Sequence, residues 1–330
     1  MMKIHYYFRN KLVGFSIQTV FTTLINQISK YHSTRVTYLV TPFANIISII
    51  RNSIYALKCE KHGEINHITG DVHYLLYVLN KKRTIVTVHD IMYYRSLHRL
   101  KKYLWKLLYI YPLKRAAHVI FISEFSKKEV LDIIKLPENK ISVIPDPISP
   151  NFCYVEKEFN SFCPQILHIG TNKRKNLHNT IRALSGIVCH LRIVGHINEE
   201  TVNLLKEYNI DYSNVYDLDD NEIVKEYINA DIINFPSLYE GFGMPIIEGQ
   251  ITGRIVVTSD MSPMQDVAGN GAMLVNPYSI ESIRNGYMKI INDRTLRHKI
   301  VEEGKMNVSK YTVEIIAEQY MKIYNTIKTI

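Results

Sequence analysis

Two glutamates separated by seven residues stand out in the stretch NFPSLYEGFGMPIIEG. Glu240 follows a short loop after an apolar strand, and Glu248 lies within the helix that begins next. Gly241 and Gly243 let the backbone approach a ligand closely, and N–H groups at a helix start can bind an anion or a hydroxyl. About two helical turns bring Glu248 back toward the same side of the helix. The spacing therefore predicts two carboxylates that hold one polar ligand.

A simpler interpretation is that Glu240 favours the positive end of the helix dipole and that Glu248 is a solvated helix residue. Glu248 has the apolar neighbours Ile246 and Ile247, and Glu240 stands between a buried strand and a glycine. These surroundings favour the ligand site over the simpler interpretation.

A cluster of cations follows a second apolar strand, in HIGTNKRKNLHNTIRAL. The strand ends at Gly170, and Lys173, Arg174 and Lys175 occupy the short loop before the next helix. Arginine makes bidentate contacts to phosphate and lysine supplies a mobile point charge, so this loop suits a diphosphate. The alternative is a solvated basic turn.

A histidine and an aspartate end a third strand, in TIVTVHDIMYY. A lone histidine in the position of His89 is more often a structural residue than a catalytic one. Residue type and position alone therefore favour a structural role, and His89 is a candidate active-site residue because of the family resemblance given below.

The elements that position these residues are short apolar strands alternating with helical patterns, which is typical of β-α-β units around a parallel sheet. Ligands of open α/β sheets bind beyond the carboxyl ends of the strands, where all three groups lie. The predicted strands are Lys3–Phe8, Arg35–Val40, Ile65–Thr69, Thr84–His89, His118–Ser123, Ser142–Pro145, Gln165–Ile169, Leu191–Val194, Asn214–Tyr216, Ile232–Phe235, Ile255–Thr258 and Met273–Val275.

A length of 330 residues favours two domains. The proline-rich segment from Asp146 to Pro164 has no periodicity and is the predicted linker. We therefore expect an N-terminal Rossmann-like domain over residues 1–155 and a second over residues 156–330, with the option that the last helix packs back on the first domain.

The sequence resembles the retaining glycosyltransferases of family four, whose mark is a Glu-x7-Glu element of the form P-S-x-x-E-G-F-G-x-P-x-x-E. The matching residues are Pro236, Ser237, Glu240, Gly241, Phe242, Gly243, Pro245 and Glu248. The similarity continues through VVTSDMSPMQDVAGNGAMLVNP, with Asp266 where glutamate is more usual. It is nearly continuous from Thr84 to about Tyr311 and patchy before Thr84.

The resemblance implies an α/β protein of GT-B fold, with two Rossmann-like domains whose parallel sheets face each other across a cleft. It implies transfer of a sugar, with retained configuration, from a nucleotide-diphosphate sugar to an acceptor hydroxyl in polysaccharide or glycolipid assembly. Two alternatives stay open: an inactive protein that binds sugar nucleotides, and an epimerase or phosphorylase of the same fold.

The resemblance also implies residue roles. Arg174 and Lys175 would hold the pyrophosphate beside Gly170, with Thr171 where many relatives have arginine. Glu240 would orient the sugar, Glu248 would bind the ribose, and His89 would face the transferred sugar. The remaining donor-binding candidates are Gly241, Phe242, Gly243 and Gly14. Gly14 lacks the second glycine that is common in the family's first loop.

We expect no cofactor and no bound metal. The acidic run Asp217–Asp220 precedes a helix, so it is better explained as a helix cap than as a metal site. The sequence has no Walker A sequence, no G-x-S-x-G elbow and no G-x-G-x-x-G, which argues against an ATPase, a hydrolase and a classical dehydrogenase.

The composition and charge of the chain limit the classes of partner that we expect it to bind. With 46% apolar and 22% charged residues the chain is an ordinary globular protein, and its four scattered cysteines fit a reducing cytoplasm. A formal charge of +9 favours anionic partners. We expect a nucleotide-sugar donor and a carbohydrate or lipid-linked acceptor but, without a nucleic-acid-binding motif, no nucleic acid.

One segment raises the alternative of a peripheral protein at the inner face of the membrane. In SLHRLKKYLWKLLYIYPLKR, Leu97, Leu100, Leu104, Leu107 and Leu108 recur at helical spacing among lysines. Such a helix can lie on anionic lipid. The interpretation we favour at this point is that the leucines pack on the sheet of the first domain and the lysines are solvated.

Overall fold

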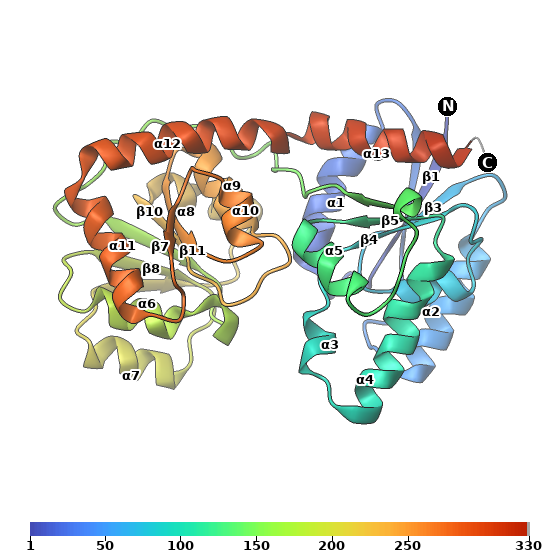
Figure 1. Ribbon diagram of the computed structural model, residues 1–330, viewed down its shortest axis with the longest axis horizontal. Helices are drawn as coiled ribbons and strands as arrows, with labels where there is room; N and C mark the ends of the chain where they lie inside the picture. The colour runs from blue at the N-terminus through green and yellow to red at the C-terminus, as the bar shows by residue number, and fades with distance from the viewer. Residues whose placement is uncertain (329–330) are drawn as a thin grey trace. The chain divides into compact units, whose positions relative to one another are not determined.

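The computed structural model describes residues 1–328 and shows two compact units, each built around a parallel six-stranded sheet (Figure 1). Unit 1 comprises Met1–Ser149 and Tyr311–Ile330, and unit 2 comprises Pro150–Lys310. Residues 144–164, between the two sheets, form neither helix nor strand, as their prolines predict.

The sheet of unit 1 has the strand order β2-β1-β3-β4-β5-β6. Its strands are β1 (Lys3–Phe8), β2 (Ser33–Tyr38), β3 (Ile65–Ile68), β4 (Thr84–Val88), β5 (His118–Phe121) and β6 (Ile141–Val143). Its helices are α1 (Phe15–Ile28), α2 (Ile46–Cys59), α3 (Met92–Ser96), α4 (Arg99–Trp105), α5 (Glu124–Leu131) and α13 (Val313–Lys328), with shorter turns η1 (His73–Tyr77), η2 (Lys106–Ile110), η3 (Tyr111–Arg115) and η4 (Glu138–Lys140).

Alternate residues of these strands face opposite layers. Tyr7 packs in an apolar cluster with Ala56 of α2 and Val130 of α5. Tyr6 faces the other side, where its hydroxyl lies 3.1 Å from that of Tyr324 in α13. The last helix of the chain is therefore part of unit 1.

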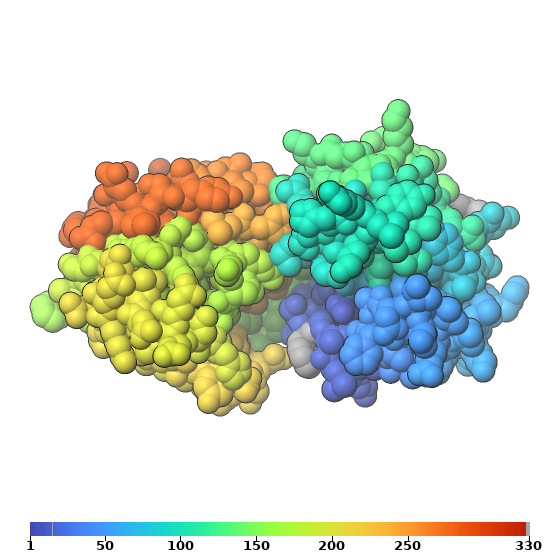
Figure 2. Space-filling model, turned by 90° about the horizontal axis from the view of Figure 1, so that it is seen from below, coloured from blue at the N-terminus to red at the C-terminus, as the bar shows by residue number. Residues whose placement is uncertain are grey.

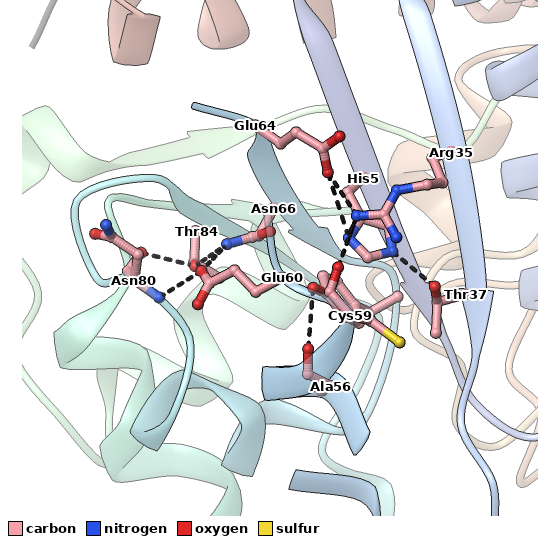
Figure 3. A network of polar contacts seen from close by, with 11 residues as sticks. His5, Arg35, Thr37, Ala56, Cys59, Glu60, Glu64, Asn66, Asn80 and Thr84 are labelled. Atoms are coloured by element: carbon pink, nitrogen blue, oxygen red, sulfur yellow. Dashed lines mark hydrogen bonds and ion pairs between the residues drawn. The ribbon is translucent and has the colours of Figure 1, made fainter. Parts of the chain in front are cut away.

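A polar network near the amino ends of this sheet fixes the end of α2 (Figure 3). Arg35 donates to Glu64 at 2.6 Å and to the carbonyl of Cys59, the last residue of α2, at 2.8 Å. The same guanidinium contacts His5, and burial lowers the pKa of that imidazole to about 3. The network is a structural brace at the sheet edge opposite the strand carboxyl ends.

The sheet of unit 2 has the order β12-β11-β10-β7-β8-β9. Its strands are β7 (Gln165–Ile169), β8 (His190–Val194), β9 (Tyr212–Val215), β10 (Ile232–Phe235), β11 (Ile255–Ser259) and β12 (Met273–Val275). Its helices are α6 (Leu177–Leu184), α7 (Glu199–Glu207), α8 (Asp220–Asn229), α9 (Met244–Ile251), α10 (Met264–Ala268), α11 (Ile280–Asn292) and α12 (Arg294–Val308), with the turn η5 (Lys173–Lys175); η6 (Ser309–Tyr311) joins the units.

All twelve predicted strands are confirmed, with ends that differ by about two residues or fewer. The acidic run before α8 does cap that helix, since the side chain of Asp219 accepts from the N–H of Glu222. Within residues 1–328, the structure brings together no trio of His, Cys, Asp or Glu suited to a metal ion.

The favoured interpretation of the leucine stripe holds for Leu108, which packs against the apolar core of unit 1, and is wrong for Leu100, Leu104 and Leu107. The α-helix there covers only Arg99–Trp105, and Leu100, Leu104 and Leu107 are exposed rather than packed on the sheet. Aromatic side chains pack there instead, since Trp105 stacks on the buried Tyr109 at 4.8 Å. No helix of the described part of the chain is long and apolar enough to cross a bilayer.

Candidate active site

Two loops at the carboxyl edge of the unit 2 sheet form the candidate site. β7 and β10 are neighbours, so the loops that follow them, with Arg174 and Glu240, leave the same sheet edge. The N–H of Leu238 donates to the carbonyl of Arg174 at 2.7 Å. The buried amide of Asn176 donates to the carbonyls of Pro236 and Pro277, at 3.0 and 2.7 Å. The two loops are therefore fastened to each other.

Glu240 lies between the two cations of the basic loop. Its carboxylate accepts from Lys175 Nζ at 2.8 Å and from Arg174 Nη1 at 3.1 Å. Glu240 is buried, while both cations are partly exposed. Two positive charges against one negative charge leave an excess of one, which attracts an anion to this edge.

The surroundings of Lys175 hold its chain in one path. Its Nζ lies 4.4 Å from the centre of the Phe235 ring. A Cβ on Gly170 would stand 3.1 Å from Cγ of Lys175, so the glycine leaves room for the aliphatic part of the lysine. Burial lowers the pKa of Lys175, and the nearby carboxylate of Glu240 opposes that shift.

Glu248 is in a different setting from Glu240. It accepts a hydrogen bond from the hydroxyl of Tyr227, at 2.5 Å, and Tyr227 is fully buried in α8. Burial raises the pKa of Glu248 to about 7, against the opposing effects of the Tyr227 hydroxyl and of Lys175. The charge of Lys175 therefore interacts with the carboxylates of both Glu240 and Glu248.

Backbone geometry sets the start of α9. Gly243 has φ of +125°, and a Cβ there would meet Ile246 at 3.0 Å. Phe242 and Gly241, just before it, are buried. Gly249, one residue after Glu248, lies so close to β10 and β11 that a Cβ would stand 2.8 Å from Ile233 and from Val256. Glycines therefore bring α9 against the sheet.

The matched serine of this loop has an unused hydrogen-bonding group. The hydroxyl oxygen of Ser237 is buried and has no partner among the described residues. Its backbone carbonyl accepts from Ser259 Oγ at 2.6 Å, which fixes the loop. A buried polar atom without a partner is costly, and a polar ligand at this edge is one way to satisfy it.

His89 lies in unit 1, at the end of β4. Its Nε2 donates to the carbonyl of Thr69 at 2.9 Å, and its Nδ1 lies 3.8 Å from a carboxylate oxygen of Asp146. Asp146 is buried, which raises its pKa, while His89 opposes that shift. Because a carbonyl oxygen can only accept, the hydrogen bond to Thr69 requires a proton on Nε2. The other ring nitrogen, Nδ1, faces Asp146.

Gly14 stands at the start of α1 with φ of +75°, a left-handed conformation that suits glycine. Gly14 lies in the first loop after β1, where this conformation favours glycine over other residues. His89 and Gly14 belong to unit 1, whereas the other predicted site residues, Gly170, Arg174, Lys175, Glu240, Gly241, Phe242, Gly243 and Glu248, lie together in unit 2.

Sequence reasoning missed a hollow of about 360 Å³ in unit 1, beyond the ends of β1 and β2. An ion pair between Arg9 and Asp71, at 3.1 Å, lines it together with Asn10. Five aromatic residues also line it: Phe43, Tyr74, Tyr93, Trp105 and Tyr109. Their scatter over the sequence gave no local pattern, so only the density of tyrosine in this half could have suggested them.

Tyr227 was missed for a similar reason, because nothing in the sequence of α8 links it to Glu248. Phe152 packs edge-on against Tyr227 with ring centres 5.2 Å apart, and it comes from the segment before the sheet. The partner of Glu248 therefore depends on packing between distant segments.

Two family models match the chain. The model described as Glycosyltransferase Family 4 matches residues 32–152, and the model described as Glycosyl transferases group 1 matches residues 159–306. The first match lies within unit 1, except for its last residues, 150–152, which belong to unit 2. The second match lies entirely within unit 2.

Curated relatives and solved structures agree with these matches. O-antigen chain mannosyltransferase RfbU of Salmonella typhimurium is 26% identical over 288 residues, which are 83% of this chain and 76% of that protein. O-antigen chain mannosyltransferase B of Escherichia coli is 25% identical over 244 residues, 66% of this chain and 63% of that protein.

Among solved structures, Anabaena HepE in complex with UDP and glucose has a TM-score of 0.82 at 13% identity, covering 99% of this chain and 100% of that one. WaaG, a glycosyltransferase involved in lipopolysaccharide biosynthesis, has a TM-score of 0.74 at 13% identity, covering 98% and 99%. At such identities the likeness concerns the fold.

Proposed function

We propose that this chain, which belongs to glycosyltransferase family 4 and has the GT-B fold, transfers a sugar from a nucleotide-diphosphate sugar to an acceptor hydroxyl with retention of configuration. The observation that carries the donor assignment is the placement of Arg174, Lys175 and Glu240 at one sheet edge. No cofactor and no metal takes part in the proposed reaction.

The basic loop supplies the leaving-group chemistry. As the bond between the sugar and the diphosphate breaks, negative charge grows on the phosphate oxygens. Lys175 and Arg174 neutralise that charge, and the N–H groups at the start of α9 stabilise it further. Glu240 keeps the two cations in place before the donor binds, so little rearrangement is needed when charge develops.

The two glutamates have separate tasks in this proposal. Glu240 hydrogen-bonds hydroxyls of the transferred sugar, on which positive charge develops in the transition state. Glu248 accepts from the ribose hydroxyls, which do not change during transfer. The hydroxyl of Tyr227 positions the Glu248 carboxylate for this contact.

Unit 1 supplies the acceptor side. The hollow beyond β1 and β2 combines aromatic faces, which pack on sugar rings, with the polar groups of Arg9, Asn10 and Asp71, which can bond sugar hydroxyls. His89 positions the transferred sugar from the end of β4. Two relatives are named O-antigen chain mannosyltransferases, which favours mannose as the transferred sugar and a growing polysaccharide or glycolipid as the acceptor.

The test is a transfer assay with a panel of UDP- and GDP-sugars and saccharide acceptors, with the product analysed by NMR. We expect one donor to be used and the new glycoside to keep the anomeric configuration of that donor. An inverted product contradicts the retaining mechanism. Binding of the donor without any product supports the inactive binding protein instead, and release of a free epimerised sugar or a sugar phosphate supports the epimerase or phosphorylase.

A further inference from the structure

α2 has a fixed inner face. The side chain of Asn52 accepts from the N–H of Thr41 at 3.0 Å and donates to the Thr41 carbonyl at 3.1 Å. Arg35 holds the carbonyl of Cys59, and Ala56 is completely buried. These contacts leave α2 one orientation within unit 1.

That orientation points a stripe of large apolar side chains outward. Ile46 and Ile47 are 69% and 65% exposed, and Ile50 and Ile54 are each 52% exposed. Leu57 continues the stripe along the helix, and Phe43 precedes it at 67% exposure. A soluble helix normally turns such residues inward, so this face is suited to an apolar environment outside the unit.

α4 adds a second exposed apolar group. Leu100, Tyr103 and Leu104 are 69%, 61% and 44% exposed on this helix. Asn52 of α2 and Trp105 of α4 line the same hollow, so the two helices flank it. Figures 1 and 2 show the blue residues of α2 and the teal residues of α4 side by side on one face of unit 1. We name the exposed apolar residues of α2 and α4, together with Phe43, the α2/α4 face.

The charge of unit 1 is complementary to an anionic surface. Unit 1 contains 24 Lys and Arg against 11 Asp and Glu, a formal charge of +13, whereas unit 2 contains 16 against 20, or −4. The sequence has no Asp or Glu before Glu60 and none between Asp90 and Glu124. Both helices of the α2/α4 face fall in these stretches, and they carry Arg51, Lys58, Lys101 and Lys102.

We propose that unit 1 docks through the α2/α4 face on a bilayer that contains anionic lipid. The isoleucines and leucines enter the boundary between headgroups and acyl chains, while the basic residues of the same helices contact the lipid phosphates. The hollow between the helices then opens beside the headgroups, where a lipid-linked acceptor is accessible. The docking itself does not depend on the donor chemistry of unit 2.

The charge of unit 1 favours a bilayer, rather than a second copy of this chain, as the partner of the α2/α4 face. Two copies of unit 1 meeting at this face would bring together two surfaces of the same sign without carboxylates to neutralise them. A phospholipid surface offers both an apolar layer and negative charge, which matches the composition of the face.

The experiment is flotation of the full chain with phosphatidylcholine vesicles, with and without about one third phosphatidylglycerol. We expect binding to the anionic vesicles only, and loss of that binding at high salt. The Ile50→Ser, Ile54→Ser double variant should lower the bound fraction about tenfold, and Arg51→Glu, Lys101→Glu should do the same.

Matched variants carry the same chemical changes elsewhere. Lys135→Glu, Lys140→Glu changes two exposed lysines between α5 and β6, and the single variant Ile315→Ser removes an exposed isoleucine of α13. Both should bind vesicles like the unaltered protein. Melting temperatures of all variants, and stabilisation of each by the nucleotide, show that each variant is folded.

Three results would overturn the proposal. The first is equal binding to neutral and anionic vesicles, and the second is undiminished binding by both α2/α4 variants. The third is a concentration-dependent dimer in solution that the Ile50→Ser, Ile54→Ser change dissolves, because this result would assign the face to a second copy.

Discussion

Lys175 contacts one glutamate of the proposed donor site and affects the pKa of the other. It pairs with Glu240 at 2.8 Å, and its charge lowers the pKa of Glu248 against the larger effect of burial. Because the two glutamates have different partners, their substitutions should have different consequences.

We expect Glu240→Gln chiefly to lower kcat. In the proposed mechanism, the hydrogen bonds of Glu240 to the sugar strengthen as positive charge develops on the ring, so their loss affects the transition state more than the bound substrate. Glu248→Gln should mainly raise the donor KM, by an amount equivalent to about 1–2 kcal/mol, because ribose contacts are equal in both states. Steady-state kinetics of both variants checks this split. Wild-type values of both constants in both variants would contradict the assigned roles.

Glu248 should also make stability depend on pH. Its pKa is raised from 4.5 to about 7 in the folded state, so the folded protein retains a proton that the unfolded chain releases. The stability from this group is present below about pH 4.5 and is lost as the pH rises through about 7. Without a donor, Glu248→Gln should therefore melt a few degrees higher than wild type at pH 8 and equally at low pH. A lower melting temperature at pH 8 would show that the carboxylate stabilises the empty site.

The candidate residues could be predicted at this scale, but not their partners. The glycines around Glu240 and the cluster of Arg174 and Lys175 are local patterns that can be recognised in the sequence. The contact between Tyr227 and Glu248 joins two helices separated by β10, so it follows only from the packing of the sheet.

At the scale of elements, α9 is placed by a close approach to two strands. Gly249→Ala should destabilise the protein by about 1–3 kcal/mol, because the new Cβ would stand 2.8 Å from Ile233 and Val256. Gly70→Ala is the matched control, since its Cβ meets only Ile17, at an ordinary 3.4 Å. Chemical denaturation measures both free energies of unfolding, and equal costs would contradict the packing argument.

The strands could be predicted and one helical segment could not. Buried parallel strands are short apolar runs between turn residues, and such runs were recognised at all twelve places. The leucines of α4 have the spacing of a buried stripe, yet Trp105, Tyr94 and Tyr109 occupy the packing position. Periodicity indicates that one face is apolar, but it does not determine what that face contacts.

At the scale of the whole molecule, the two units differ in charge as well as in predicted substrate. The formal charge of +9 is the sum of +13 in unit 1 and −4 in unit 2. The composition alone predicts an anionic partner, but only the division into units shows that the excess of positive charge lies in unit 1.

Transfer should not require a divalent metal, since in the proposed mechanism the basic loop performs the neutralisation that a metal performs elsewhere. Activity should survive EDTA within about a factor of two. Full loss of activity that magnesium or manganese restores would contradict this prediction.

The central claim is that Lys175 and its neighbours bind the diphosphate of the donor. The direct measurement is the shift in melting temperature caused by UDP or GDP at millimolar concentration in wild type, Lys175→Ala and Lys173→Ala. Lys173 is exposed in the same loop, so its variant removes an equal charge without removing the contact to Glu240. A nucleotide at about 100 times its Kd should stabilise the wild type by about 2.7 kcal/mol. The account predicts that Lys173→Ala keeps most of this stabilisation and that Lys175→Ala loses it; full stabilisation of Lys175→Ala, or none in the wild type, would contradict it.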